Sequence, residues 1–201
     1  MLTYFSLSLR FGDGSIGRRS LQTSPNTVLE IGVITSSVTS EFLRKRKQAL
    51  LYGKRGQLED ACRAYEELLF AQCQNVRMVL QNLYTLAMER GDREWARYIV
   101  EKHREAVRLY DMGAYAEWAA VLEHAMDTED SELTLEAMER VFENIDTLNG
   151  FTASPLYRHM HFKAVEDSFE NLLLCRLKQE FRADPRLDFL RDDPRLEALL
   201  T

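Results

Sequence analysis

Residues 51–69 read LYGKRGQLEDACRAYEELL, and 35 positions further on residues 86–104 read LAMERGDREWARYIVEKHR. In each copy an Arg-Gly pair separates two stretches with apolar patterning, and an alanine follows the glycine by five residues. Glycine permits a tight turn between two helices, and alanine permits their close approach because its side chain is a single methyl group. The glycines are Gly56 and Gly91, and the alanines expected at the helix crossings are Ala61 and Ala96.

Apolar residues recur with a helical period of 3.6 from residue 41 onward, and no strand alternation follows residue 40. We therefore expect an all-α fold of antiparallel helix pairs that stack to bury their apolar faces. The expected N-caps are Ser40, Asn75 and Asp92, and the expected helix ends are Gly56, Gly91 and Asn149-Gly150. A fifth helix is expected from about Ala114 to Met126. A last helical stretch would begin at the cap Ser154 with Pro155 and continue to about Phe181.

A period of 34–35 residues with Gly followed by Ala five positions later resembles the tetratricopeptide repeat (TPR). The matching residues of the first copy are Ala49, Tyr52, Gly56, Ala61 and Tyr65. The departures are Lys45 in the Trp slot, Cys73 in the Pro slot, Tyr84 in the small-residue slot and His103 in the last alanine slot. A third copy would use Ala137. The resemblance covers about 41–148 and implies a short right-handed solenoid whose first helices line a concave face.

Near the C-terminus, Asp-Pro-Arg-Leu at 184–187 recurs nine residues later at 193–196. Each copy predicts an Asp cap, Pro at the first helical position and one turn with an apolar face. Such tails resemble the closing segments of bacterial TPR arrays and the C-terminal sensor halves of some helix-turn-helix regulators. We expect residues 184–201 to cap a helical domain that spans 41–201.

Residues 1–40 differ from the rest in composition, with 8 Ser and 5 Thr against only 3 Ser in residues 41–201. Phe5, Leu7, Leu9 and Phe11 alternate with other residues, which is the period of a strand. We expect a weakly structured leader or a short hairpin that contributes little to the helical core. A secretory signal is not expected, because the start lacks a basic region and Arg10 interrupts the apolar stretch.

Charge and composition argue against several classes of protein. The net charge of −6 over 201 residues disfavours direct, non-specific binding of nucleic acid. No apolar run exceeds five residues, so no membrane span is expected. Cys62, Cys73 and Cys175 lack Cys-x-x-Cys spacing, which predicts reduced thiols and a cytoplasmic location.

The sequence predicts no catalytic residue, metal or cofactor, since phosphate loops, nucleophile elbows and zinc-protease motifs are absent. His159 and His161 would point about 200° apart on one helix, so they would not share a metal. His103 lies on an apolar stripe and is expected to be packed and hydrogen-bonded. The basic run at 44–47 surrounds its helix and is expected to be solvated.

The expected function is a non-enzymatic scaffold that binds a protein or peptide on the concave face. The TPR slots for such a partner fall on Arg46, Leu50, Met78, Gln81, Asn82 and Thr85. Arg46 and Asn82 match the charge and amide used for a carboxylate, whereas Leu50 replaces an expected amide. The alternative is a sensor or dimerisation module of a helix-turn-helix regulator that lacks its DNA-binding half. A homodimer, and coverage of these slots by the leader or a second subunit, are left open.

Overall fold

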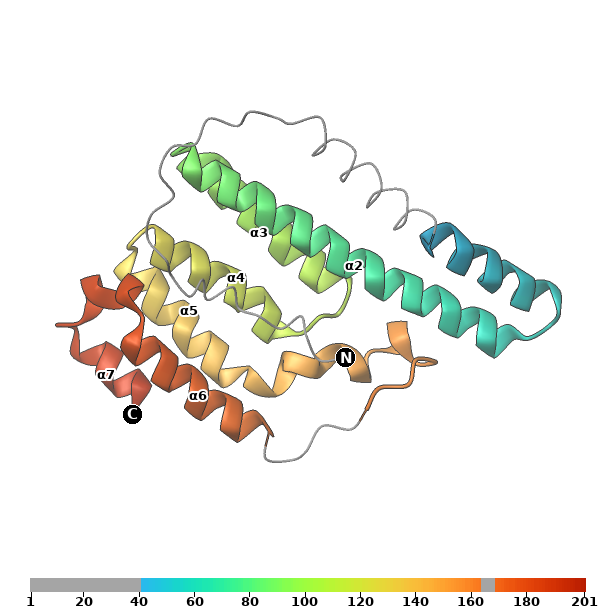
Figure 1. Ribbon diagram of the computed structural model, residues 1–201. Coiled ribbons are helices and arrows are strands. Elements are labelled where there is room, and N and C mark those ends of the chain that lie inside the picture. The colour runs from blue at the N-terminus through green and yellow to red at the C-terminus, as the bar shows by residue number, and fades with distance from the viewer. Residues whose placement is uncertain (1–40, 164–168) are drawn as a thin grey trace, which may run out of the picture.

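The computed structural model describes residues 41–163 and 169–201, and within these ranges the chain is helical, without a strand (Figure 1). The all-α prediction is thereby confirmed for this part of the chain. A first helix spans residues 41–54. It is followed by α2 (Leu58–Glu89), α3 (Arg93–Leu109), α4 (Ala114–Asp127), α5 (Ser131–Glu143), the 3₁₀ segments η1 (Ile145–Ala153) and η2 (Pro155–Tyr157), α6 (Phe169–Ala183), η3 (Pro185–Leu190) and α7 (Pro194–Leu200). None of the described helices combines the length and apolar character needed to cross a bilayer.

The helix α2 is continuous over 32 residues, or about 48 Å at 1.5 Å per residue. The expected helix start at Asn75 is therefore wrong, because this residue lies exposed in the middle of α2. No glycine or proline occurs from residue 58 to residue 89, and Cys73 stands in the slot where the TPR has its proline. Without a residue that breaks the hydrogen-bond ladder, the second helix of one pair and the first helix of the next form a single rod.

Consecutive helices pack side by side along this rod. The helix at 41–54 turns at Gly56, where φ is +74°, and α3 follows a turn at Gly91, where φ is +72°. Both positions require the left-handed backbone that glycine adopts without strain. In Figure 1 the helix at 41–54 lies along the N-terminal half of α2 and extends beyond the other helices. Ala61 and Ala96 are 7% and 0% exposed, as the repeat pattern predicts.

The two halves of α2 bury different faces. Ala61 and Leu68 are buried in the N-terminal half, whereas Cys73 at the midpoint and Tyr84 and Ala87 in the C-terminal half are buried on another face. At 100° per residue these two faces lie about 120° apart around the helix axis. The first half therefore packs against the helix at 41–54, and the second half packs against α3 and the rest of the bundle.

The C-terminal segments form two capped turns, as the Asp-Pro-Arg-Leu repeat predicts. Asp184 accepts a hydrogen bond of 2.9 Å from the backbone N–H of Arg186, and Asp193 accepts one of 2.9 Å from that of Arg195. Helix α7 packs against α5 and α6. The apolar faces of the two turns are buried through Leu187, Leu190, Leu196 and Leu200.

Two expected helix boundaries between α5 and α6 are wrong. Helix α5 ends at Glu143, before Asn149-Gly150, and continues as 3₁₀ segments. Ser154 does cap the following turn, since Leu156 N–H donates to its Oγ at 3.0 Å, but that turn spans only Pro155–Tyr157. Tyr157 is buried there and donates to the Tyr110 carbonyl at 3.0 Å, so long-range packing decides this region. The leader predictions and Ser40 lie outside the described residues.

Candidate binding surface

The structure places the six predicted slots on two helices. Arg46 and Leu50 lie exposed on the helix at 41–54, and Met78 and Asn82 lie exposed on α2. Leu50 is 49% exposed and Met78 is 54% exposed. The remaining two slots, Gln81 and Thr85, are half-buried.

Arg46 and Asn82 lie far apart along α2. An ion pair of 3.8 Å joins Lys45 Nζ to Glu67 Oε2, so Arg46 is level with about residue 66 of the antiparallel rod. Asn82 is therefore about 24 Å further along the axis, at 1.5 Å per residue. One carboxylate cannot contact both side chains. An extended peptide of about seven residues, at about 3.3 Å each, would span the distance.

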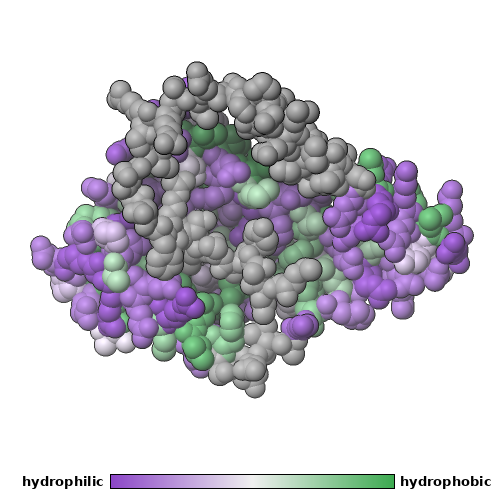
Figure 2. All heavy atoms as spheres, viewed as in Figure 1, coloured by the Kyte–Doolittle hydropathy of each residue, from purple (hydrophilic) through white to green (hydrophobic). Residues whose placement is uncertain are grey.

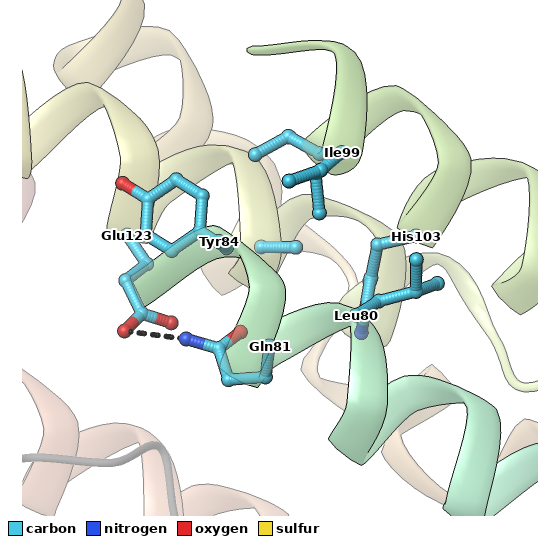
Figure 3. Close-up of a pocket in the computed structure, with 8 residues that line it drawn as sticks. Leu80, Gln81, Tyr84, Ile99, His103 and Glu123 are labelled. Atoms are coloured by element: carbon cyan, nitrogen blue, oxygen red, sulfur yellow. Dashed lines mark hydrogen bonds between the residues drawn. The ribbon is translucent and has the colours of Figure 1, made fainter. Parts of the chain in front are cut away.

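Gln81 and Thr85 are engaged within the protein. Gln81 Nε2 donates a hydrogen bond of 3.0 Å to Glu123 Oε1 of α4 (Figure 3). The Thr85 hydroxyl donates to the Gln81 carbonyl oxygen at 3.1 Å, one turn earlier in α2. The surface available to a partner among the predicted slots therefore consists of Arg46, Leu50, Met78 and Asn82.

Most of the exposed large apolar side chains lie on the same two helices as these four residues. Nine of the thirteen exposed large hydrophobic side chains in the described ranges lie on the helix at 41–54 and on α2. They are Leu43, Leu50, Leu51, Leu58, Tyr65, Val76, Met78, Val79 and Leu86. Figure 2 shows hydrophobic residues among hydrophilic ones at the end of the molecule where the helix at 41–54 lies. Leu58 and Tyr65 are exposed because the neighbouring helix covers another side of α2.

A second polar bridge joins α2 to α4 and to the C-terminal cap. The Tyr84 hydroxyl donates to Asp127 Oδ2 at 2.9 Å and lies 3.4 Å from His124 Nδ1. Arg186 pairs with Asp184 at 2.8 Å and approaches Asp127 at 3.8 Å. Burial, and then the negative charge of Asp127, raise the pKa of Tyr84 well above its usual range. The hydroxyl therefore remains a donor at every physiological pH.

Arg77 and His103 lie in the interior between α2 and α3 with unsatisfied nitrogen atoms. Arg77 is half-buried, and its Nη1 donates to Gln74 Oε1 at 3.3 Å, but its buried Nε has no partner. His103 is 8% exposed and its Nδ1 also has no partner, so the expected hydrogen bond is absent at that atom. Burial, and then the charge of Arg77, lower the pKa of His103 to about 4. The imidazole is therefore neutral at pH 7.

A small cavity adjoins His103. Its volume is about 10 Å³, and its walls include Gln81, Tyr84, His103, Ala120 and Glu123, several of which Figure 3 shows. A second and wider hollow of about 810 Å³ opens between α3, α4 and α5, with Trp118 on α4 and arginines of α3 in its walls. The smaller cavity lies on the side where α2 faces α4, next to the predicted slots.

The other candidate residues have ordinary structural roles. His159 Nδ1 lies 2.5 Å from Glu66 Oε1, and His161 is exposed. The three cysteines are free thiols, as expected. Lys45 pairs with Glu67, and Arg44 lies 4.0 Å from Glu41. Within residues 41–163 and 169–201, no three His, Cys, Asp or Glu side chains form a group that could hold a metal ion.

Comparison with protein-family models, with curated protein sequences and with solved structures finds no match to this chain. A functional interpretation therefore rests on the surfaces described above.

Proposed function

We propose that the chain is a non-enzymatic binding module that holds a protein or peptide segment along α2. In this proposal the first helix and α2 to α5 form a short right-handed TPR-like stack. The segment would run in extended form past Arg46 and Leu50 toward Met78 and Asn82. The TPR resemblance implies partner binding on this surface. Here the continuous helix α2 separates its two ends, Arg46 with Leu50 and Met78 with Asn82.

The concentration of exposed apolar side chains on the helix at 41–54 and α2 carries this proposal. Isolated apolar residues on a surface are ordinary, but a concentration on one pair of helices is typical of an interaction site. Leu50 and Met78 would act as apolar anchors, and Arg46 and Asn82 would supply a charge and an amide beside them. Burial of one such anchor is worth about 1.5–3 kcal/mol, which is tenfold or more in affinity.

A peptide-display selection against the immobilised full chain tests the proposal. Selected peptides are synthesised, and their affinities are measured by fluorescence anisotropy for the wild type and for the double variant Leu50→Asp, Met78→Asp. Leu109→Asp is the matched control, because Leu109 is 72% exposed on α3. We expect the double variant to bind at least about tenfold more weakly and the control to bind within about twofold of the wild type. Equal affinities in all three folded proteins, as judged by circular dichroism, would move the site away from α2.

A further inference from the structure

Side chains of α2 and α4 form a regular series of polar bridges. Tyr84 reaches Asp127, and three residues earlier in α2 Gln81 reaches Glu123 of α4. Both bonds connect residues 42–43 positions apart, so the two helices run in the same direction. In each bridge α2 contributes the donor and α4 contributes the carboxylate.

The next position of the series has a donor but lacks its carboxylate. Arg77 lies one turn before Gln81 on α2, whereas the residues one turn before Glu123 on α4 are Ala119 and Ala120. In the described part of the chain, the interactions of the Arg77 guanidinium are with the neutral groups Gln74, Cys73 and His103. Its buried Nε has no partner. A strong cationic donor thus stands on α2, and α4 lacks the acid that the pattern would place opposite it.

The Arg77 guanidinium has no counter-ion among the described residues. A half-buried guanidinium without a counter-ion loses hydration that no described carboxylate replaces, so it reduces stability. His103 beside it is more than nine-tenths buried and also leaves a ring nitrogen unpaired. A cavity of about 10 Å³, lined by His103 and Gln81 but not by Arg77, has room for about one oxygen atom. The unpartnered Nε of this guanidinium suits an oxygen ligand that comes from outside the chain.

We propose that Arg77 is the anchor for a carboxylate of the bound partner, which completes the series of acid-paired positions between α2 and α4. This inference rests on the proposed function and adds the chemistry of the ligand: a peptide with an acidic side chain or a free C-terminal carboxylate near the middle of α2. A guanidinium binds a carboxylate through two parallel N–H bonds, so lysine would replace it poorly. Arg77 faces inward, one position before the predicted slot Met78.

The first test uses a probe that does not depend on the partner. Sodium acetate is titrated into the ¹⁵N-labelled full chain while the arginine Nε–Hε resonances are recorded, with sodium chloride at equal ionic strength as the control. The Arg77 resonance is the one missing from the spectrum of Arg77→Lys. We expect a saturable shift of this resonance with acetate and no saturation with chloride. A linear response to both salts, or equal responses at Arg77 and exposed Arg97, overturns the proposal.

The second test uses the selected peptides in matched forms. Each acidic peptide is compared with its Glu→Gln or Asp→Asn version, and with free and amidated C-termini, to distinguish a side-chain from a terminal carboxylate. We expect loss of the relevant carboxylate to weaken wild-type binding at least tenfold and to change Arg77→Met binding less than twofold. Arg97→Met controls for the loss of one positive charge. Equal sensitivity in the wild type and Arg77→Met contradicts the inference.

The two proposals fail separately. If peptides bind along α2 but neither acetate nor the matched peptides distinguish Arg77, the peptide-binding function stands and the carboxylate site is wrong. If acetate saturates Arg77 while no peptide binding depends on Leu50 and Met78, the anion site stands and the proposed function is wrong. Arg77→Met is expected to melt at or above the wild-type temperature, because methionine fills the interior without a charge. A marked fall in its melting temperature would assign Arg77 a structural role instead.

Discussion

The hydroxyl of Tyr84 donates a hydrogen bond of 2.9 Å to Asp127, the last residue of α4, and so joins two helices that are separated in the chain by α3. Tyr84 occupies the slot where a TPR has a small residue, and its ring is buried. A large side chain is accommodated there because its polar end reaches a carboxylate at the rim. Arg186 of the C-terminal cap approaches the same carboxylate, which connects the cap to the middle of the bundle.

Replacement of Tyr84 by phenylalanine is expected to lower the free energy of unfolding by about 1–3 kcal/mol, because a hydrogen bond to a charged group is lost. Urea denaturation followed by circular dichroism measures the change. Tyr98→Phe is the control, since Tyr98 is an exposed tyrosine on α3. Equal stability of the two variants would show that the bond to Asp127 contributes nothing.

Replacement of Ala61 or Ala96 by leucine is expected to cost about 1–3 kcal/mol through overpacking of a helix crossing. Both alanines are buried, whereas Ala71 on α2 is exposed and serves as the control site for the same substitution. Thermal denaturation compares the three variants. Wild-type melting temperatures for the two crossing variants would refute the register of the helix pairs.

The neutral state of His103 predicts a loss of stability in mild acid. Its pKa is about 4 in the folded chain against 6.5 for an unperturbed imidazole, so below pH 6.5 the unfolded chain binds more protons than the folded one. Stability therefore falls as the pH decreases from about 6.5 to about 4, by on the order of 3 kcal/mol. Urea denaturation at pH 7.5, 6.0 and 5.0 measures this loss. His103→Gln should have a shallower pH dependence, and an unchanged slope would assign the loss to other groups.

Asn75→Ala distinguishes a continuous α2 from two helices that meet at residue 75. In the interior of a helix, alanine is the better residue, so the variant should be more stable by about 0.5 kcal/mol. At an N-cap the same change would cost about 1 kcal/mol. Asn75→Pro should cost about 3 kcal/mol or more, since proline breaks an interior helix. If Asn75→Ala lowered the stability and Asn75→Pro were tolerated, the results would support two separate helices that meet at residue 75.

The separation of Arg46 and Asn82 predicts a dependence on the length of the bound peptide. The joint change of Arg46 to Glu and Asn82 to Ala should weaken a bound segment of about seven residues or more by at least about tenfold. Shorter segments should respond to only one of the two single variants, because they cannot reach both side chains. Titrations with a peptide truncated from each end measure this difference, and equal responses at every length would contradict the extended arrangement.

Local signals in the sequence account for most of the described fold. Gly56 and Gly91 mark turns that need a positive φ, and Asp92, Asp184 and Asp193 cap the segments that follow them. The continuity of α2 was harder to predict, because an asparagine is suitable both as an N-cap and at an exposed position inside a helix. The repeat pattern favoured the cap, whereas the absence of glycine and proline over residues 58–89 favoured the rod.

Features that depend on distant contacts could not be predicted from the sequence. The 3₁₀ segments after α5 are held by Phe151 and Tyr157, which pack around Phe70 of α2. The polar bridges from α2 to α4 depend on the relative placement of two helices some 40 residues apart. Arg77 cannot be singled out from the sequence, because its buried and unpartnered Nε depends on contacts between helices. Gly-Ala spacing places helices in register, but it does not report which side chains remain unpaired.

The uninterrupted α2 also fixes the distance between Arg46 and Asn82, the two ends of the proposed binding surface. In a stack of separate helix pairs, the turns between helices allow the stack to bend when it binds a partner. Here no turn interrupts α2 between the level of Arg46 and Asn82, which are about 24 Å apart along its axis. In the proposed binding mode, a segment that contacts both Arg46 and Asn82 must span this fixed distance, so the rod would discriminate against segments that are too short.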